Sequence, residues 1–283
     1  MTDGPTTERI SVLRSGNLDL ANDGIWYARG HQDLRYLEQD DTDWLLIEEK
    51  SFWYQHRSKL FVEIAKRYPP SGEIFEVGAG HGAVSVALQN SGFQVVAVEP
   101  TVNWARYARE RGIKEVVCAT LENSGFGAGT LSNVGMFDVL EHIPNDTEYL
   151  RYVRSLMKTG GRFYCAVPAH NLLWSNEDEC AGHCRRYALG NLCHKMGVAG
   201  FTIEYGTYYF RPLVLPILLL RSFPTALGLR SARTPGTSQR EHCLQPGMVS
   251  RGIARLLEGE VKTIAAGGRI RFGASCVVVA KAN

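Results

Sequence analysis

Short apolar runs and helical stripes alternate along most of the chain. Runs rich in β-branched and aromatic residues predict strands, and apolar positions spaced three and four residues apart predict helices. The predicted strands are 73–77, 94–99, 115–118, 133–140, 161–167, 201–210 and 272–281. The predicted helices are 48–68, 82–91, 102–111, 146–158, 187–197 and 248–265. This alternation predicts an α/β fold, in which helices cover both faces of a parallel sheet and a ligand binds at the carboxyl ends of the strands.

The turn after the first predicted strand is the most informative segment. It reads Glu76-Val77-Gly78-Ala79-Gly80-His81-Gly82 and leads directly into a helical pattern. Glycines lack the Cβ atom that would keep a ligand from the backbone, and a helix N-terminus presents free N–H groups. Glu99 ends the next apolar strand, about twenty residues on, where an acid that binds a ribose is expected. The segment therefore predicts a nucleoside-binding site.

Acidic residues distinguish between the possible nucleotide ligands. Glu76 lies two residues before the first glycine, where its carboxylate would repel the pyrophosphate of a dinucleotide. Asp138 and Glu141 add acids at the end of the fourth strand, along the same edge. S-adenosylmethionine carries a sulfonium, an ammonium and a ribose diol but no phosphate, so charge-assisted bonds to carboxylates suit it. The pattern favours S-adenosylmethionine and disfavours a nicotinamide-dependent dehydrogenase.

With these motifs the chain resembles the class I S-adenosylmethionine-dependent methyltransferases, over roughly residues 50–200 and again in the closing strand. The resemblance implies a Rossmann-like, doubly wound, seven-stranded and mostly parallel sheet with an antiparallel last strand, plus an N-terminal helical lid. Leu131-Ser132 departs from the Phe-Asp pair usual early in the family's fourth strand, although the ligand-facing end is intact. The cofactor-binding residues implied are Arg57, Glu76, Gly78, Ala79, Gly80, Gly82, Glu99, Pro100, Thr120, Leu121, Asp138, Val139 and His142.

A narrower resemblance covers residues 167–187, which look like a branch of small-molecule and glycan-modifying methyltransferases. In that branch the loop after the fifth strand closes over the substrate. The expected organisation is a cap or lid at 1–50 and a methyltransferase domain at 51–283, with a substrate loop at 168–187 and an insertion at 211–247.

Three histidines are candidates for a catalytic base: His142, His170 and His183. A base near a hydroxyl acceptor contributes roughly 10²–10⁴-fold to the rate, and histidine is the commonest one. Each residue also has a structural alternative. His142 could cap a helix beside Pro144, His170 could be an ordinary loop residue, and His183 could order its loop against Asp178 or Glu179.

Six further residues are candidates for binding the acceptor, namely Trp26, Tyr27, Trp53, Arg185, Arg186 and Tyr187. The aromatic residues of the N-terminal segment either form a lid over the acceptor or pack a helix onto the sheet. Arginine binds carboxylate and phosphate groups well. Arg185 and Arg186 therefore either anchor an acidic substrate or form ion pairs with Asp178 and Glu179.

No metal ligands are assigned. Cys180, His183, Cys184 and Cys193 lack the closely paired thiols of a structural zinc site. A magnesium site made of Asp138, Glu141 and His142 remains an alternative, by analogy with some quinone-type relatives.

Composition argues against several classes of protein, namely nucleic-acid-binding, secreted and membrane-spanning proteins. The net charge is +2 over 283 residues, and the absence of a lysine- or arginine-rich run argues against nucleic acid binding. The polar N-terminus lacks the apolar region of a secretory signal, and seven scattered cysteines favour the cytoplasm. The longest apolar run, 212–220, contains two prolines and is too short to span a bilayer. It is either buried or a surface for an apolar substrate, a partner subunit or a membrane.

The sequence therefore predicts transfer of a methyl group from S-adenosylmethionine to a small molecule, more readily at oxygen than at nitrogen. The alternatives are a sugar or glycan hydroxyl, an amine nitrogen, and a non-catalytic protein that only binds S-adenosylmethionine. A homodimer is left open.

Overall fold

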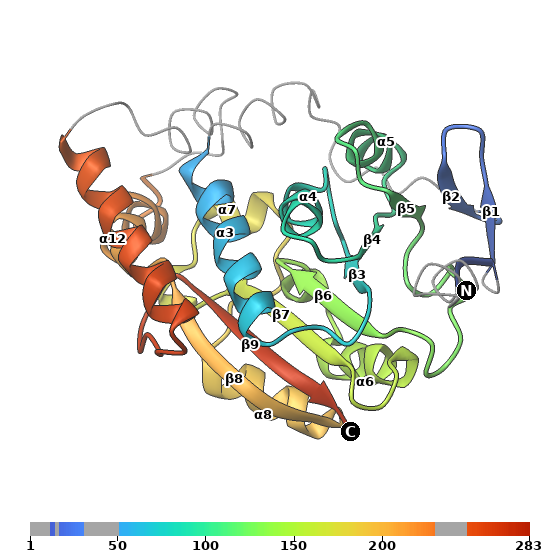
Figure 1. Cartoon of the computed structure of the whole chain (residues 1–283). Coiled ribbons are helices and arrows are strands. Elements are labelled where there is room, and N and C mark those ends of the chain that lie inside the picture. The colour runs from blue at the N-terminus through green and yellow to red at the C-terminus, as the bar shows by residue number, and fades with distance from the viewer. Residues whose placement is uncertain (1–11, 15–16, 31–50, 230–247) are drawn as a thin grey trace.

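The computed structural model describes residues 12–14, 17–30, 51–229 and 248–283, without the side chains of 248–250. Nine strands form one sheet that crosses the whole molecule (Figure 1). They are β1 Leu18–Leu20, β2 Ile25–Ala28, β3 Ile74–Val77, β4 Val95–Val98, β5 Glu115–Cys118, β6 Asn133–Phe137, β7 Arg162–Pro168, β8 Phe201–Tyr209 and β9 Ser275–Ala282.

The strand order is β1-β2-β5-β4-β3-β6-β7-β9-β8. All pairs from β2 to β7 are parallel. β9 inserts between β7 and β8 and runs antiparallel to both. The predicted mostly parallel sheet with an antiparallel last strand is confirmed. The carboxyl ends of β3, β4, β5, β6 and β7 meet along one edge, because parallel strands point the same way.

The sheet has nine strands rather than seven because the N-terminal segment extends it. β1 and β2 form an antiparallel hairpin, and β2 pairs in parallel with β5. The prediction of a helical lid over 1–50 is therefore wrong for the hairpin, which lies at the outer edge of the sheet. Residues 1–11, 15–16 and 31–50 of that prediction lie outside the described part of the chain.

Helices cover both faces of the sheet, as the alternation of side chains along the strands requires. On β4, Val95 and Ala97 face one side, and Val96 and Val98 face the other. The first face is covered by α3 Phe52–Arg67, α4 Ala83–Asn90, α5 Val102–Glu110 and α12 Met248–Ala265. The second is covered by α6 Asp146–Leu156 and α8 Leu189–Val198.

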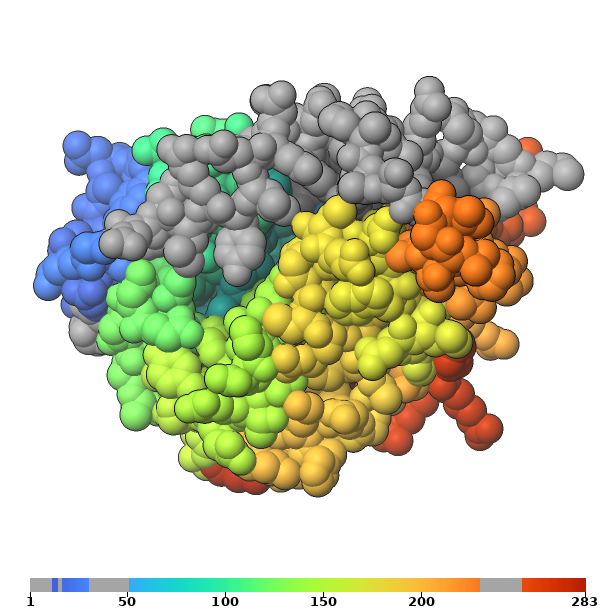
Figure 2. All heavy atoms as spheres, turned by 180° about the vertical axis from the view of Figure 1, so that it is seen from behind, coloured from blue at the N-terminus to red at the C-terminus, as the bar shows by residue number. Residues whose placement is uncertain are grey.

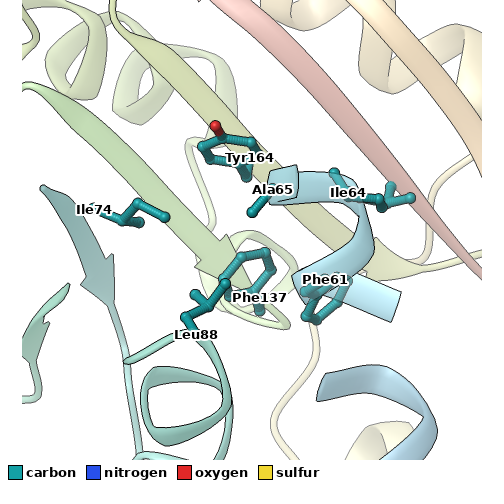
Figure 3. Close-up of a pocket in the computed structure, with 8 residues that line it drawn as sticks. Phe61, Ile64, Ala65, Ile74, Leu88, Phe137 and Tyr164 are labelled. Atoms are coloured by element: carbon teal, nitrogen blue, oxygen red, sulfur yellow. The ribbon is translucent and has the colours of Figure 1, made fainter. Parts of the chain in front are cut away.

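Helix α3 packs tightly against the centre of the sheet (Figure 3). Phe61 of α3 stacks on Phe137 at the end of β6, with ring centroids 4.2 Å apart. Leu88 of α4 and Tyr164 of β7 complete the apolar contact. The space between these side chains has no room for a water molecule, so this is packed core and not a ligand site.

The chain between β8 and residue 229 is helical throughout. It comprises η3 Arg211–Leu213, α9 Val214–Ile217, a π-helical turn Leu218–Ser222 and α10 Phe223–Ala226. Residues 230–247, the rest of the predicted insertion, lie outside the described residues. None of the helices that the structure describes has the length and hydropathy needed to span a bilayer.

Candidate active site

The glycine turn between β3 and α4 has the backbone conformation that makes glycine necessary. Gly78, Gly80 and Gly82 have φ angles of +71°, +56° and +79°. A Cβ atom at Gly78 would lie 2.6 Å from Cγ2 of Val139, and one at Gly82 would collide with Ile113. A Cβ at Gly80 would meet no described atom within 4 Å, so this glycine faces open space. The turn thus packs against the protein at Gly78 and Gly82 and has free space beside it at Gly80.

Glu99, at the end of β4, holds this turn in place. Its carboxylate accepts hydrogen bonds from the backbone N–H groups of Gly80 and Thr101, both at 2.8 Å. Burial raises the pKa of Glu99, and the two amide bonds oppose that rise. The side chain of Thr101 donates a third hydrogen bond to Glu99, and a carboxylate has about four acceptor sites. Glu99 can therefore order the turn and still accept a hydrogen bond from a ribose hydroxyl.

Two more predicted acids lie along the same edge. Glu76 is buried on β3 and accepts a hydrogen bond from the hydroxyl of Ser85 on α4. Asp138 directly follows β6 and forms an ion pair with Arg57 of α3. Arg57, predicted to bind the cofactor, thus lies at the strand ends, where it is paired with an acid. Asp138 has a φ of +59°, which ends β6 at Phe137 rather than at the predicted residue 140.

The remaining predicted cofactor residues follow the neighbouring strands. Pro100 follows β4, Thr120 and Leu121 follow β5, and Val139 lies against Gly78. Figure 2 shows a hollow in the surface between the green and yellow parts of the chain, with teal atoms deeper in it. The open side of Gly80, the acid at Glu99 and the absence of any phosphate-binding cation in the glycine turn (residues 78–82) fit S-adenosylmethionine.

Two of the three candidate histidines lie together. His142 belongs to η1 Leu140–His142, just beyond β6, and its ring centroid is 4.8 Å from that of His183. Between them and the core lies Glu141, which is fully buried. Within the described part of the chain, neither of its carboxylate oxygens has a hydrogen-bond partner. Its nearest ionisable neighbour is His183, whose Nε2 lies 3.9 Å from Oε1 of Glu141.

Burial sets the protonation of this group. It raises the pKa of Glu141 well above the usual range, and the charge of Asp138 adds to the rise. Burial also lowers the pKa of His142, and the neighbouring His183 lowers it further. Burial thus favours the uncharged form of both Glu141 and His142.

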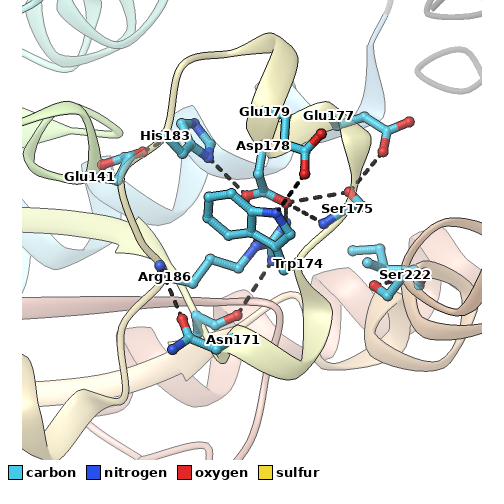
Figure 4. Close-up of polar contacts among 12 residues, drawn as sticks. Glu141, Asn171, Trp174, Ser175, Glu177, Asp178, Glu179, His183, Arg186 and Ser222 are labelled. Carbon is cyan, nitrogen blue, oxygen red and sulfur yellow. Dashed lines mark hydrogen bonds and ion pairs between the residues drawn. The ribbon is translucent and has the colours of Figure 1, made fainter. Parts of the chain in front are cut away.

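Asp178 fixes the orientation of His183 (Figure 4). Nδ1 of His183 lies 2.8 Å from Oδ1 of Asp178, so Nδ1 is the nitrogen that carries the proton and donates. Arg186 donates to both oxygens of Asp178, at 2.7 and 2.8 Å, and the backbone N–H of Ser175 donates to Oδ2 at 2.9 Å. Burial raises the pKa of Asp178, but the bonds from His183 and Arg186 outweigh it and lower the pKa overall. Nε2 of His183 is left facing Glu141 with a free lone pair.

His170 is not part of this group. It follows β7 with a φ of +59°, and its ring stacks between Phe272 and Tyr208, at centroid distances of 4.3 and 4.8 Å. The structure therefore joins His142 to His183 and places the third candidate between aromatic rings.

Both arginines of the substrate loop form ion pairs within the protein. Arg186 pairs with Asp178, as one of the two alternatives foresaw. Arg185 pairs instead with Asp146, with Nη1 and Oδ2 2.8 Å apart. Tyr187 is buried and donates its hydroxyl to Asp146 at 2.8 Å. The prediction that Tyr187 binds substrate is therefore wrong, because its polar atom is used to order the loop.

Two of the aromatic candidates lie on an outer strand of the sheet. Trp26 and Tyr27 belong to β2, which is separated from β3 by β5 and β4. Trp26 is buried, and its Nε1 donates to Glu115 of β5. Both residues extend the sheet, and their role towards the acceptor stays a prediction. Trp53, at the start of α3, stacks on Phe210 with centroids 3.9 Å apart, and its role towards substrate stays a prediction.

Nothing in the sequence singled out Asp146, and Glu141 was predicted only as an acid of the strand edge and as part of a metal alternative. Both residues follow β6, but nothing local indicates that Glu141 is fully buried. Ligand atoms of Glu141, His142 and His183 lie within 4.8 Å of one another. This group differs from the predicted magnesium set in having His183 instead of Asp138, and it contains no cysteine.

Comparisons with known proteins agree with this geometry. A family profile described as a methyltransferase domain matches residues 52–205. The ubiquinone biosynthesis O-methyltransferase of Xanthomonas axonopodis pv. citri (strain 306) is 28% identical over 111 residues, which make up 37% of this chain and 46% of that protein. The chain thus matches less than half the length of these curated relatives.

Solved structures share the fold. Phosphoethanolamine N-methyltransferase 2 of Haemonchus contortus, in complex with S-adenosylmethionine, superposes with a TM-score of 0.54 at 18% identity, over 88% of this chain and 58% of that one. A methyltransferase of Archaeoglobus fulgidus gives a TM-score of 0.50 at 16% identity, over 84% and 99% of the two chains. Because the family profile covers more than half of the chain, the protein belongs to the methyltransferase-domain family.

Proposed function

We propose that this methyltransferase acts on a hydroxyl group of a small molecule and that His183 is the general base. The observation that carries the proposal is the contact between Nδ1 of His183 and the buried carboxylate of Asp178, at 2.8 Å. A carboxylate that accepts from Nδ1 fixes the tautomer and leaves Nε2 as a proton acceptor. The curated relatives with O-methyltransferase in their names support oxygen as the acceptor atom.

The surroundings of His183 suit a base whose ring is held in one orientation. Burial raises the pKa of Glu141, which disfavours a second carboxylate charge beside the histidine. Bound S-adenosylmethionine supplies an electrophilic methyl group on a sulfonium. His183 takes the proton of the acceptor hydroxyl at Nε2, and Asp178 stabilises the imidazolium that results. Glu99 and the glycine turn hold the cofactor, and Arg186 keeps Asp178 ionised.

The test compares two histidine variants. His183→Gln is expected to lower kcat by roughly 10²–10⁴-fold, as the loss of a general base does, while the affinity for S-adenosylhomocysteine stays unchanged. His170→Gln is the matched control and should retain turnover, because His170 lies between Phe272 and Tyr208 instead. Full activity of His183→Gln would refute the assignment of the base.

The main alternative role for Nε2 of His183 is to bind a metal ion. Chelation with EDTA followed by dialysis should leave the activity intact if the histidine moves a proton. Loss of activity on chelation and its return with magnesium or zinc would instead assign His183, with Glu141 and His142, to a metal. Metal analysis of the purified protein gives a second and independent readout.

The class of acceptor is tested by transfer of a labelled methyl group. Catechols, sugar hydroxyls and primary amines should be offered in parallel, and the methylated atom should then be mapped. The proposal expects label on a phenolic or alcoholic oxygen. Label on nitrogen alone would refute it, and S-adenosylhomocysteine binding with no transfer to any acceptor would favour a protein that only binds the cofactor.

A further inference from the structure

The helical segment after β8 is apolar on both of its faces. Leu213 and Ile217 point into the core and are buried. The opposite face carries six large apolar side chains, each more than half exposed, which we call the leucine row. They are Leu215, Leu219, Leu220, Phe223, Leu227 and Leu229. Contiguous exposed apolar residues on one segment indicate a surface that meets another apolar phase.

A cationic cleft adjoins the start of the leucine row. It has a volume of about 950 Å³ and lies between η3, α12 and the loop before β9. Four arginines line it, and we call it the arginine cleft: Arg211, Arg255, Arg269 and Arg271. Leu256 and Phe272 add exposed apolar surface to its wall.

The arginine cleft has little negative charge of its own. Glu260 is the only carboxylate among its lining residues, and it is buried. Its oxygens bind His56 and the backbone N–H groups of Phe210 and Arg211, at 2.7–3.0 Å. Within the described residues, no carboxylate forms an ion pair with any of the four arginines. Among the described residues, the lining of the cleft therefore carries more positive than negative charge.

The two features share one face of the molecule. Arg211 and Pro212, which line the arginine cleft, come just before the helical turn that contains Leu215, so the cleft adjoins the start of the leucine row. Figure 2 shows the orange part of the chain, which contains this segment, protruding at the surface. The leucine row starts at the carboxyl end of β8, which is parallel to β7. It thus begins at the edge of the sheet that holds the glycine turn.

We propose that the leucine row and the arginine cleft dock this protein onto the surface of an anionic lipid bilayer. The apolar side chains enter the boundary between headgroups and acyl chains, and the arginines bind lipid phosphates, as in interfacial amphipathic helices. Charge complementarity favours this occupant over a second copy of the chain. A two-fold contact through this face would bring arginine cleft against arginine cleft without acids to balance them.

The experiment is flotation of the full-length protein with vesicles, and it requires neither cofactor nor turnover. Binding is expected to vesicles that contain phosphatidylglycerol and to be much weaker to phosphatidylcholine alone, with a decrease at high salt. The double variant Leu219→Glu/Leu220→Glu should lose flotation. Arg255→Glu/Arg271→Glu should lower the affinity by more than about fivefold per arginine, since each reversal replaces attraction with repulsion.

The matched control is Leu20→Glu, which changes an equally exposed leucine on β1, at the opposite edge of the sheet. It should float like the unmodified protein, and all variants should keep its melting temperature, since the altered side chains are exposed. Equal flotation of Leu219→Glu/Leu220→Glu and the control would overturn the proposal.

Two other results would also overturn it. A dimer in gel filtration that Leu219→Glu/Leu220→Glu dissociates, with no flotation, would assign the face to a second copy of the chain. Calorimetric binding of inorganic phosphate that needs Arg255 and Arg271, again with no flotation, would assign the cleft to a free anion.

Discussion

Replacing Gly80 by alanine tests where the cofactor meets the backbone. Gly80 has a φ of +56°, and a Cβ there would meet no described atom within 4 Å. The substitution therefore adds no clash inside the protein and costs only the strain of a left-handed residue, about 1–2 kcal/mol. In a chain of this size that lowers the melting temperature by about 2–4 °C per kcal/mol. If the cofactor packs against the open side of Gly80, the added methyl group must displace it.

The expected loss of cofactor affinity follows from overpacking, which typically costs about 1–3 kcal/mol. That corresponds to a roughly 5- to 150-fold increase in the Kd for S-adenosylhomocysteine, measured by isothermal titration calorimetry. Gly92→Ala is the matched control. Gly92 has a φ of +92° and equally open surroundings among the described residues, but it lies in the turn before β4, at the opposite edge of the sheet.

Gly92→Ala should reproduce the change in melting temperature and leave the Kd unchanged. Unaltered affinity in Gly80→Ala would refute the placement of the cofactor. Equal losses of affinity in both variants would show that the effect comes from stability and not from contact.

Two further predictions follow from the buried acids. Glu99→Ala should weaken binding of S-adenosylhomocysteine by roughly 1.5–3 kcal/mol, the value of hydrogen bonds to a charged group; an unchanged Kd in calorimetry would contradict the ribose contact. Burial raises the pKa of Asp146, but hydrogen bonds from Lys195, Tyr187 and Arg185 lower it below its ordinary value of 3.8. The ionised form is thus favoured in the folded state, so its contribution to stability is complete above pH 3.8 and is lost as the pH falls through the lowered folded-state pKa. Urea unfolding should show Asp146→Asn less stable than the unmodified protein at neutral pH, with the gap narrowing in acid; a gap that stays constant with pH would refute this linkage.

From β3 to β8 the order of the strands and of the main helices between them could be predicted from the sequence alone. Alternating β-branched runs and helical stripes are local signals, and they predicted the seven strands from β3 to β9 to within a few residues. The glycine turn and Glu99 could also be predicted from the sequence. Three glycines mark a turn with positive φ angles, and the acid stands at the end of a recognisable strand. One local signal misled: Val139 and Leu140 continue the apolar pattern of β6, yet the left-handed conformation of Asp138 ends the strand.

Only the tertiary structure decided which side chains meet. Glu141 and His183 are far apart in the sequence, as are Arg57 and Asp138, and their contacts depend on how the loops fold over the sheet edge. For the same reason the sequence could not separate His170 from the other histidines. It also could not show that Trp26 extends the sheet, or that residues 212–220 bury one face and expose the other. Local sequence patterns predict backbone conformation because it depends on neighbouring residues. Burial and side-chain pairing depend on residues that are distant in the sequence, so only the folded chain determines them.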